Sequence, residues 1–261
     1  MNNSYRPQKS LGQHWLFDED SLSAMVAAGE VSGEDVVLEI GPGLGSLTSY
    51  LTAVASKVIA VEADEELAMG LKARVPFENL EVIKGDILEF NASKLPKGYK
   101  VVANIPYYIT SKILQNFLEA DNQPSLMALL VQKELAERVV ATPGDMSVLA
   151  FSVQYYAKAK MLGIVPKELF DPMPKVDSAV LQVRIRNKPY FPADTKELFR
   201  LVKAGFGERR KQLANSLAGG LRIDKDEAIV MLEKANISSS ARAQELSMDQ
   251  WQQLYKQYCQ K

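Results

Sequence analysis

The chain has 261 residues, with 31 Lys and Arg against 32 Asp and Glu, one His and one Cys. This length and its 47% hydrophobic residues indicate a globular protein with one large or two smaller domains. A single Cys excludes an internal disulfide, and with a single His it excludes a Cys/His zinc cluster, so we expect no metal. The longest apolar runs are far shorter than the roughly 18 residues of a membrane span. The polar first ten residues lack an apolar targeting segment, so we expect a cytoplasmic protein without membrane contact.

The first two-thirds of the chain alternates apolar runs typical of strands with stretches typical of helices. Strands are predicted at residues 36–40, 57–61, 80–84, 100–103 and 126–131, and helices at 47–55, 64–74, 111–118 and 133–140. This alternation predicts an α/β fold with a mostly parallel sheet and helices on both faces. Two further strands are predicted at 148–156 and 178–185, and the second alternates apolar and polar residues as a strand near a sheet edge does.

The pattern becomes helical after residues 187–192, where two Pro in six residues indicate a linker. One helix is predicted at 196–217, ended by Gly219 and Gly220. Shorter helices are predicted at 225–235 and 248–258, each opened by a capping-box pattern: Asp224 with Glu227, and Ser247 with Gln250. We therefore expect an α/β domain at 1–188 and a small all-helical domain at 189–261.

Basic residues are concentrated in one segment, although the net charge of the chain is −1. Residues 184–222 contain ten Lys or Arg and three acids. Such an asymmetry is typical of a local anion-binding face, and a solvated helix face is the alternative interpretation.

A glycine-rich turn follows the first predicted strand, with Gly41, Gly43 and Gly45 at alternate positions. Such glycines let the backbone pass close to a ligand at the start of a helix. Glu62 ends the second strand, where related folds hold a ribose, and Asp86 follows the third, where an acid can meet an adenine edge. The three strand ends together favour a cofactor that contains adenosine. An ordinary tight turn is the alternative, and the spacing differs from that of dinucleotide-binding folds.

The sequence Asn104-Ile105-Pro106-Tyr107 ends the fourth predicted strand, where α/β sheets bind ligands. It resembles the N-[LI]-P-Y motif of methyltransferases that act on exocyclic amino groups of nucleobases. An adenine amino group is a poor nucleophile because its lone pair is delocalised into the ring. The Asn104 side-chain oxygen and the Ile105 carbonyl could accept its two N–H groups and favour a pyramidal nitrogen, while Tyr107 offers a flat face for stacking. A proline turn capped by Asn104, with Tyr107 in the core, is the alternative interpretation.

Taken together, these motifs resemble the ribosomal RNA adenine N6-dimethyltransferases over nearly the whole chain. The family is related to the large-subunit enzymes that confer macrolide resistance, but three C-terminal blocks favour the small-subunit branch. The residues that carry the resemblance lie at 9–16, 41–45, 62, 85–86, 104–107, 132–134, 170–180, 209–217 and 242–247. The fold implied is a Rossmann-like S-adenosylmethionine-dependent methyltransferase domain with a helical C-terminal domain.

The resemblance also implies roles for individual residues. His14 and Leu16 would close over the methionine end of S-adenosylmethionine, and Phe170 would form a stacking slot with Tyr107. The implied catalytic residues are Asn104, Ile105, Pro106, Tyr107 and Phe170. The implied cofactor site consists of His14, Leu16, Gly41, Gly43, Gly45, Glu62, Asp86, Ile87 and Asn104.

The implied partner is 16S rRNA within the immature small ribosomal subunit. Arg209, Arg210 and Lys211 would bind this RNA, and the helical tail would help to dock the enzyme, which we expect to be a monomer. The implied reaction forms dimethyladenosine at two adjacent adenosines near the 3′ end of the rRNA.

Some positions depart from the family pattern. The usual G-Q-N-F-L reads G-Q-H-W-L here, with His14 and Trp15 in place of Asn and Phe. Tyr108 replaces the usual Asn and adds an aromatic side chain beside the target pocket, and residues 142–147 form a shorter loop. Three alternatives stay open: a large-subunit adenine methyltransferase, a non-catalytic assembly or transcription factor, and a dinucleotide oxidoreductase, which the glycine spacing disfavours.

Overall fold

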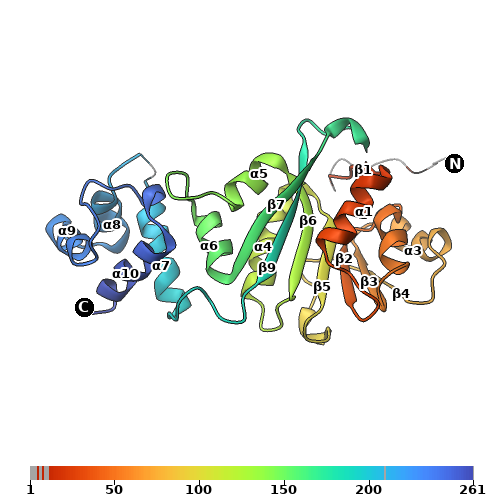
Figure 1. Cartoon of the computed structure of the whole chain (residues 1–261), viewed down its shortest axis with the longest axis horizontal. Coiled ribbons are helices and arrows are strands. Elements are labelled where there is room, and N and C mark those ends of the chain that lie inside the picture. The colour runs from red at the N-terminus through yellow and green to blue at the C-terminus, as the bar shows by residue number, and fades with distance from the viewer. Residues whose placement is uncertain (1–4, 6–7, 9–11, 209, 261) are drawn as a thin grey trace. The chain divides into compact units, whose positions relative to one another are not determined.

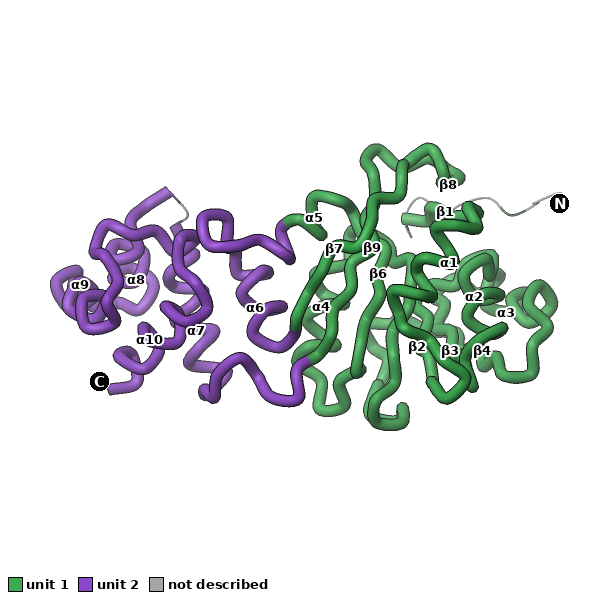
Figure 2. The backbone as a smooth tube through the Cα atoms, in the orientation of Figure 1, with its two compact units in different colours: residues 1–137, 158–185 green, residues 138–157, 186–261 purple. Residues whose placement is uncertain are grey.

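The computed structural model describes residues 5, 8, 12–208 and 210–260. The chain forms two compact units, coloured separately in Figure 2. Unit 1 contains residues 1–137 and 158–185, and unit 2 contains residues 138–157 and 186–261. The chain thus enters unit 2 at residue 138 and returns to unit 1 at residue 158. It leaves unit 1 again after residue 185, three residues before the domain boundary expected at 188. Residues 138–157, expected in the first domain, belong to unit 2.

Unit 1 is built on a seven-stranded sheet with the order β4-β3-β2-β5-β6-β9-β7 (Figure 1). Its strands are β2 (Val36–Ile40), β3 (Lys57–Glu62), β4 (Leu80–Lys84), β5 (Lys100–Asn104), β6 (Leu126–Gln132), β7 (Ala157–Val165) and β9 (Ser178–Ile185). Neighbouring strands from β4 to β6 are parallel, and β9 is antiparallel to β6. A separate antiparallel pair joins β1 (Trp15–Leu16) to β8 (Phe170–Asp171).

The strand order places a topological switch point between β2 and β5. After β2 the chain continues to β3 on one side, whereas β5 pairs with the other side of β2. In open α/β sheets, ligands bind beyond the carboxyl ends of the strands at such a point. The glycine-rich turn and the Asn104–Tyr107 sequence therefore both lie where this topology forms a crevice.

Helices cover the sheet of unit 1 because both faces of a buried parallel sheet must be shielded from water. They are α1 (Glu19–Ala28), α2 (Ser46–Thr52), α3 (Glu65–Arg74), α4 (Thr110–Glu119) and α5 (Lys133–Val139), which ends two residues inside unit 2. Short 3₁₀ turns lie at Ala92–Lys94, Tyr107–Ile109 and Lys167–Leu169. The N-cap side chains Asp18 and Asp64 accept backbone N–H groups at the starts of α1 and α3. The expected α/β fold with a mostly parallel sheet is confirmed.

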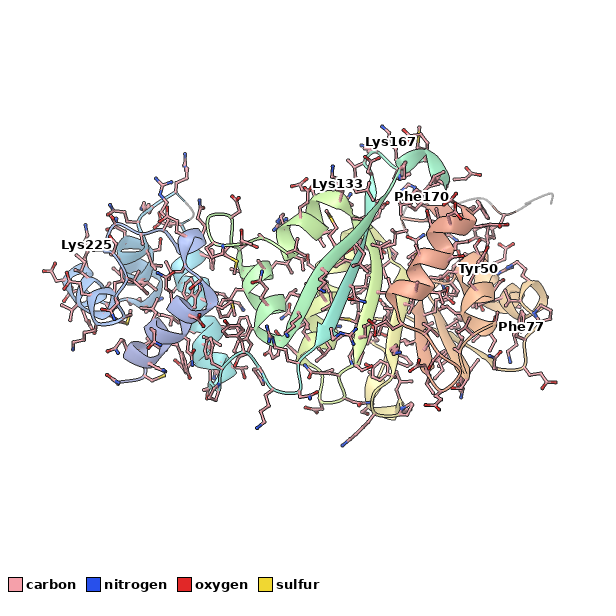
Figure 3. The ribbon with its side chains drawn as sticks, in the orientation of Figure 1. Tyr50, Phe77, Lys133, Lys167, Phe170 and Lys225 are labelled. Atoms are coloured by element: carbon pink, nitrogen blue, oxygen red, sulfur yellow. The ribbon has the colours of Figure 1, made fainter. Side chains whose placement is uncertain are left out.

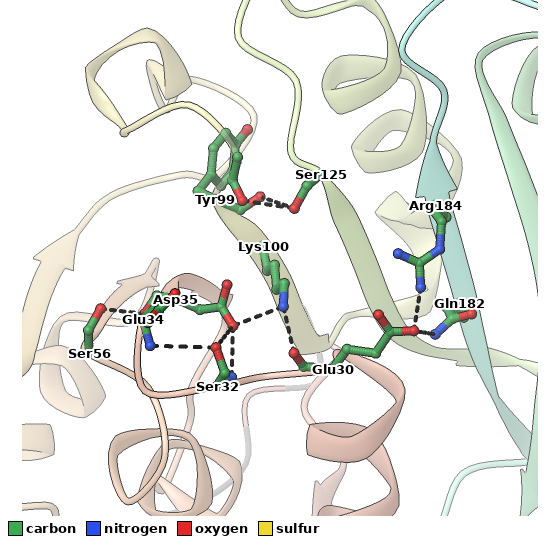
Figure 4. Close-up of polar contacts among 11 residues, drawn as sticks. Glu30, Ser32, Glu34, Asp35, Ser56, Tyr99, Lys100, Ser125, Gln182 and Arg184 are labelled. Atoms are coloured by element: carbon green, nitrogen blue, oxygen red, sulfur yellow. Dashed lines mark hydrogen bonds and ion pairs between the residues drawn. The ribbon is translucent and has the colours of Figure 1, made fainter.

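A polar network ties together the amino ends of the central strands (Figure 4). The ammonium group of Lys100, which begins β5, pairs with the Asp35 carboxylate at 2.9 Å and donates to the Glu30 carbonyl. The Glu30 carboxylate in turn pairs with Arg184 of β9. These contacts hold together the loops at the amino ends of the strands. The crevice lies at the opposite, carboxyl ends.

Unit 2 is helical and contains α6 (Val148–Tyr156), α7 (Thr195–Phe206), α8 (Leu213–Leu221), α9 (Lys225–Lys234) and α10 (Met248–Tyr258). A 3₁₀ turn at Ala243–Glu245 precedes α10. The capping box of Ser247 and Gln250 is confirmed at the start of α10. Asp224 is the N-cap of α9, but its side chain makes no cap hydrogen bond, so the expected Asp224–Glu227 box is wrong.

The strand predicted at 148–156 is wrong, because these residues form the helix α6. Ser147 caps it by accepting the Ala150 N–H at 3.1 Å. Phe151 and Tyr155 lie four residues apart on one helix face, and their rings stack with centroids 6.0 Å apart. A short, mostly apolar run does not distinguish a buried strand from a buried helix. The strand that the sequence pattern missed is β7, which begins at the next residue.

The single helix predicted at 196–217 is also wrong, because α7 and α8 are separate. Gly219 and Gly220 do not end a helix; both lie inside α8, which ends at the left-handed Arg222. A Cβ atom at Gly220 would lie 2.6 Å from the Cβ of Ala204 in α7. Gly220 therefore lies at a close contact between the two helices, and it serves packing rather than termination.

Candidate functional site

A cavity of about 360 Å³ opens at the carboxyl ends of β2, β3, β4 and β5 in unit 1. This volume lies within the usual range of small-ligand pockets. Its wall contains these residues of the predicted site: His14, Leu16, Gly41, Gly43, Glu62, Asp86, Ile87, Asn104, Ile105, Pro106 and Tyr107. The chain thus brings together residues from four strand ends and from the segment before α1.

The glycine-rich turn follows β2 and forms one side of the cavity. Gly41, Gly43 and Gly45 all adopt positive φ angles, which side chains with a Cβ rarely tolerate. A Cβ atom at Gly43 would lie 3.0 Å from the indole nitrogen of Trp15, so that the missing side chain leaves room for the indole. Gly45 is the N-cap of α2 and is absent from the cavity wall; a Cβ atom there would clash with Val75.

Glu62 holds the turn in place from the end of β3. One carboxylate oxygen accepts the Gly43 N–H at 3.0 Å, and the other accepts the Asp64 N–H at 2.9 Å. The residue is 5% exposed, and its burial raises the pKa of the carboxyl above its ordinary value. Glu62 therefore faces the cavity as a fixed acceptor of hydroxyl groups.

Glu39 is a second buried acid in the cavity wall, for which the sequence analysis proposed no role. It is 1% exposed, and its Oε2 has no hydrogen-bond partner among the described residues. Burial, together with the neighbouring Glu62 carboxylate, raises the pKa of Glu39 to about 8. A carboxyl group in an otherwise apolar strand was the available sequence signal, since buried acids are costly unless they serve a function.

Asn104 ends β5 and is oriented by the segment before α1. Its side-chain amide nitrogen donates to the His14 carbonyl at 2.9 Å. This bond directs the amide so that Oδ1 stays outside the contact and can accept a hydrogen bond from a ligand. Ile105 is buried, and Pro106 starts the 3₁₀ turn that carries Tyr107.

The ring of Tyr107 is fixed on one face and at its hydroxyl group. The imidazole of His14 stacks on it with ring centroids 5.8 Å apart and an interplanar angle of 20°. The Tyr107 hydroxyl lies 2.7 Å from the Oγ of the buried Ser178, and burial raises the pKa of this tyrosine. His14 is itself held by its Nδ1, which lies 2.6 Å from the Pro172 carbonyl and donates to it.

Phe170 lies apart from the cavity wall, although the resemblance places it opposite Tyr107. It is 4% exposed, pairs with Leu16 in the β1–β8 ladder and belongs to the hydrophobic core of unit 1 (Figure 3). The ring that stacks on Tyr107 in this structure is that of His14. A slot between Tyr107 and Phe170 would require the β1–β8 segment to move, so this role of Phe170 stays a prediction.

Tyr108, expected beside the target pocket, does line the cavity, and Trp15 and Lys112, for which no site role was predicted, line it as well. The aromatic substitutions at 15 and 108 were visible as departures from the family pattern, but their side-chain directions were not. Asp86 is exposed and accepts the Leu88 N–H at 2.9 Å, which shapes the turn after β4, and Ile87 is buried beside it.

The predicted RNA-binding residues lie in the turn between α7 and α8 in unit 2. Arg209 lies outside the described residues, while Arg210 and Lys211 are exposed. Lys211 pairs with Glu208 at 2.6 Å, so part of its charge is already matched. Within the described part of the chain, no group of three or more His, Cys, Asp or Glu could hold a metal ion. None of the described helices is long and apolar enough to cross a membrane.

The switch-point crevice, its glycine-rich turn and the acid at the end of β3 define a Rossmann-like methyltransferase. Residues 5–260 match the family model described as ribosomal RNA adenine dimethylase. The chain therefore belongs to the ribosomal RNA adenine dimethylase family, and it is an enzyme of that family.

Relatives and solved structures agree with this assignment. The chain is 41% identical over 254 residues to "Ribosomal RNA small subunit methyltransferase A" of Dehalococcoides mccartyi, covering 95% of this chain and 87% of that protein. It is 42% identical to the protein of the same name from Desulfitobacterium hafniense, with coverage of 95% and 90%. A dimethyladenosine transferase from Plasmodium falciparum superposes with a TM-score of 0.81 at 26% identity (94% and 97% covered). The 23S rRNA methyltransferase ErmE superposes with a TM-score of 0.75 at 28% identity (93% and 98% covered).

Proposed function

We propose that this enzyme transfers methyl groups from S-adenosylmethionine to the N6 amino groups of two adjacent adenosines near the 3′ end of small-subunit (16S) rRNA. Each adenosine receives two methyl groups. The observation that carries the proposal is the Asn104–Tyr107 turn at the end of β5, which opens into the same cavity as the glycine-rich turn. The names of the relatives at about 40% identity support the small subunit as the source of the RNA.

The residues of the cavity fit S-adenosylmethionine. The buried Oε2 of Glu39 has no partner among the described residues, and a Cβ atom at Gly41 would meet nothing within 4 Å, so that both leave polar or open space for a ligand. Glu62 would accept the ribose hydroxyls, and Asp86 with Ile87 would border the adenine. His14 and Leu16 would cover the methionine end. When bound, this group supplies an electrophilic methyl group on its sulfonium sulfur.

The chain's own residues would orient the acceptor nitrogen for an in-line displacement. Asn104 Oδ1 and the Ile105 carbonyl would accept the two N–H groups of the target amine, which directs its lone pair toward the methyl group. Tyr107 would hold the base by stacking. The amine nitrogen would form its new bond to the methyl carbon and would release one proton to solvent. Positioning and exclusion of water would supply most of the rate enhancement.

The target base must leave its stack to reach Asn104, as base-modifying enzymes generally require. The imidazole of His14 stacks on one face of Tyr107 in this structure. An adenine that stacks on this face would displace the imidazole, and a slot with Phe170 as its second wall would require the β1–β8 segment to move. Because His14 donates to the Pro172 carbonyl, both movements are linked to the segment after Phe170.

The immature small subunit is the substrate particle that we propose, and we propose that the enzyme acts on it as a cytoplasmic monomer. The exposed basic residues at Arg210 and Lys211 suit contact with RNA phosphates. RNA within a folded particle presents its backbone and a few unpaired bases, and a separate basic unit can bind that backbone while unit 1 receives the base.

Methylation mapping tests the proposed function. The purified enzyme and S-adenosylmethionine would be incubated with small-subunit particles that lack the methyl groups and, in parallel, with naked 23S rRNA. We expect dimethyladenosine at two adjacent positions near the 3′ end of 16S rRNA, detected by primer extension and mass spectrometry. Methylation of 23S rRNA alone would instead assign the enzyme to the large subunit, and absence of transfer to either RNA would leave a non-catalytic assembly role.

A further inference from the structure

Tyr108 is an exposed aromatic side chain at the mouth of the cavity. It is 63% exposed, compared with 48% for Phe17, and it lines the cavity in which Tyr107 also lies. An exposed aromatic ring in the wall of a cavity has a face on which a base can stack. Tyr108 makes no contribution to the chemistry proposed above, so its position requires a separate explanation.

The ring of Tyr108 lies beside Gly12. A Cβ atom at Gly12 would lie 3.4 Å from two ring carbons of Tyr108 and 3.6 Å from the Cβ of Pro106. Gly12 also adopts a φ of +61°, which favours glycine. The residue beside the ring therefore has no side chain to cover it, and 63% of Tyr108 stays open to solvent, as a stacking platform requires.

A basic side chain lines the same cavity from the next element. Tyr108 belongs to the 3₁₀ turn Tyr107–Ile109, whereas the exposed Lys112 lies in the first turn of α4 (Thr110–Glu119). An aromatic ring combined with a nearby cation is the arrangement by which proteins hold single-stranded nucleic acid, since the ring stacks on a base and the cation binds the backbone.

We propose that Tyr108 is the stacking platform for the nucleotide adjacent to the target adenosine, and that Lys112 binds a phosphate of the same strand. This inference rests on the proposed function, in which two adjacent adenosines are modified. Tyr107 and Tyr108 are consecutive residues of one 3₁₀ turn. The inner ring takes the base being methylated, and the outer ring takes its neighbour, so that the pair can exchange places between rounds of transfer.

Fluorescence of 2-aminopurine tests the platform. A small-subunit particle would carry one adenosine and one 2-aminopurine at the two target positions. Only the adenosine has the N6 amino group that Asn104 binds, so the 2-aminopurine falls on Tyr108. With S-adenosylhomocysteine bound to the full-length enzyme, we expect stacking to quench the 2-aminopurine emission in the wild type and in Tyr108→Phe. We expect Tyr108→Asn to lose the quenching. With S-adenosylmethionine in place of S-adenosylhomocysteine, we expect this variant to methylate the adenosine about tenfold more slowly than the wild type at subsaturating particle concentration.

Phe77→Asn is the matched control, because Phe77 is 44% exposed and is not among the residues that line the cavity. It should quench and methylate as the wild type does. Lys112→Met should lower the salt slope of particle binding by about one unit. The platform would be refuted if Tyr108→Asn still quenched the 2-aminopurine emission. It would also be refuted if the wild-type enzyme methylated the adenosine without quenching that emission. The proposed function would stand in both cases. A particle whose adenosine gains no methyl group from the wild type would refute the proposed function and the platform with it.

Discussion

At the scale of single residues, the structure shows that the amide nitrogen and oxygen of Asn104 have different surroundings. Its amide nitrogen donates to the His14 carbonyl, and under the proposed function its oxygen accepts the amino group of the target base. A polar side chain that is already oriented costs no reorganisation during reaction, which is why such groups contribute strongly to catalysis.

Replacement of Asn104 by Ala should lower the rate of methyl transfer by roughly 10²-fold or more, the scale for one preorganised polar contact in a water-excluded site. Particle binding should stay near that of the wild type, since the exposed basic residues of unit 2 are unchanged. Single-turnover methylation of saturated enzyme–particle complexes measures this rate. Near-wild-type turnover would show that Asn104 does not orient the amino group.

The buried Glu39 carboxyl makes the stability of the folded protein depend on pH. Because burial raises its folded-state pKa to about 8, the folded protein keeps it protonated where the unfolded chain, with a pKa of 4.5, is already ionised. The unfolded state is therefore favoured by roughly 1.4 kcal/mol per pH unit between about pH 4.5 and 8 through this group. The contribution of Glu39 to the free energy of unfolding is fully present below pH 4.5 and is lost as the pH rises toward 8.

Glu39→Gln should remove this loss. Without cofactor, we expect the variant to exceed the wild type in free energy of unfolding by about 2–3 kcal/mol more at pH 7 than at pH 5. Urea unfolding at the two pH values measures the difference, and the exposed Glu34→Gln is the control. Parallel pH profiles for wild type and Glu39→Gln would mean that the Glu39 carboxyl ionises normally in the folded state.

At the scale of elements, unit 2 depends on the close approach of α7 and α8. Gly220 and Ala204 meet where a Cβ atom would fall at 2.6 Å, whereas the neighbouring Gly219 has no atom within 4 Å of its Cβ position. Two consecutive glycines in one helix thus serve different purposes.

Gly220→Ala should destabilise unit 2 by about 1–3 kcal/mol, because the added methyl group overpacks the α7–α8 contact. Gly219→Ala should instead stabilise it by roughly 0.5–1 kcal/mol, since alanine favours a helix interior. Thermal or denaturant unfolding of both variants compares the two effects. Equal effects of the two substitutions would contradict the packing role of Gly220.

The turn between α7 and α8 carries the predicted basic residues. Replacing Arg209, Arg210 and Lys211 together by Ala should weaken particle binding and flatten its salt dependence by about one unit per lost phosphate contact. Lys211 should contribute least, because Glu208 already pairs with it. Binding titrations over a range of salt concentrations measure the slope, with cofactor affinity as the control. A slope equal to that of the wild type would make this turn an ordinary solvated surface.

At the scale of the whole molecule, the cofactor cavity is lined by residues of unit 1 alone. A ligand that binds only the folded state stabilises it by about 2.7 kcal/mol at a hundred times its Kd. S-adenosylhomocysteine should therefore slow hydrogen exchange most in residues 41–45 and 85–87, whereas the amides of α9 and α10 should exchange as before. Equal protection of α9 and α10 would show that both units unfold together.

The sequence by itself determined the α/β class, the order of the glycine-rich turn, Glu62 and Asp86 along the strand ends, and the family. These features are local: a strand, its turn and the side chain that ends it are close in the chain, and their periodicity is set by backbone geometry. The Asn104–Tyr107 sequence was recognisable for the same reason. The main errors concerned residues 148–156 and 196–217, where apolar side chains fit a strand or one long helix equally well until they pack.

Only the tertiary structure decided how distant segments share the cavity. Three features depend on contacts between residues far apart in sequence. They are the stacking of His14 on Tyr107, the burial of Phe170 beside Leu16, and the lack of a hydrogen-bond partner for the Oε2 of Glu39 among the described residues. The same holds for residues 138–157, which leave the α/β unit to pack with the C-terminal helices. Close packing and desolvation act between such segments, and neither is encoded in the spacing of a single stretch of chain.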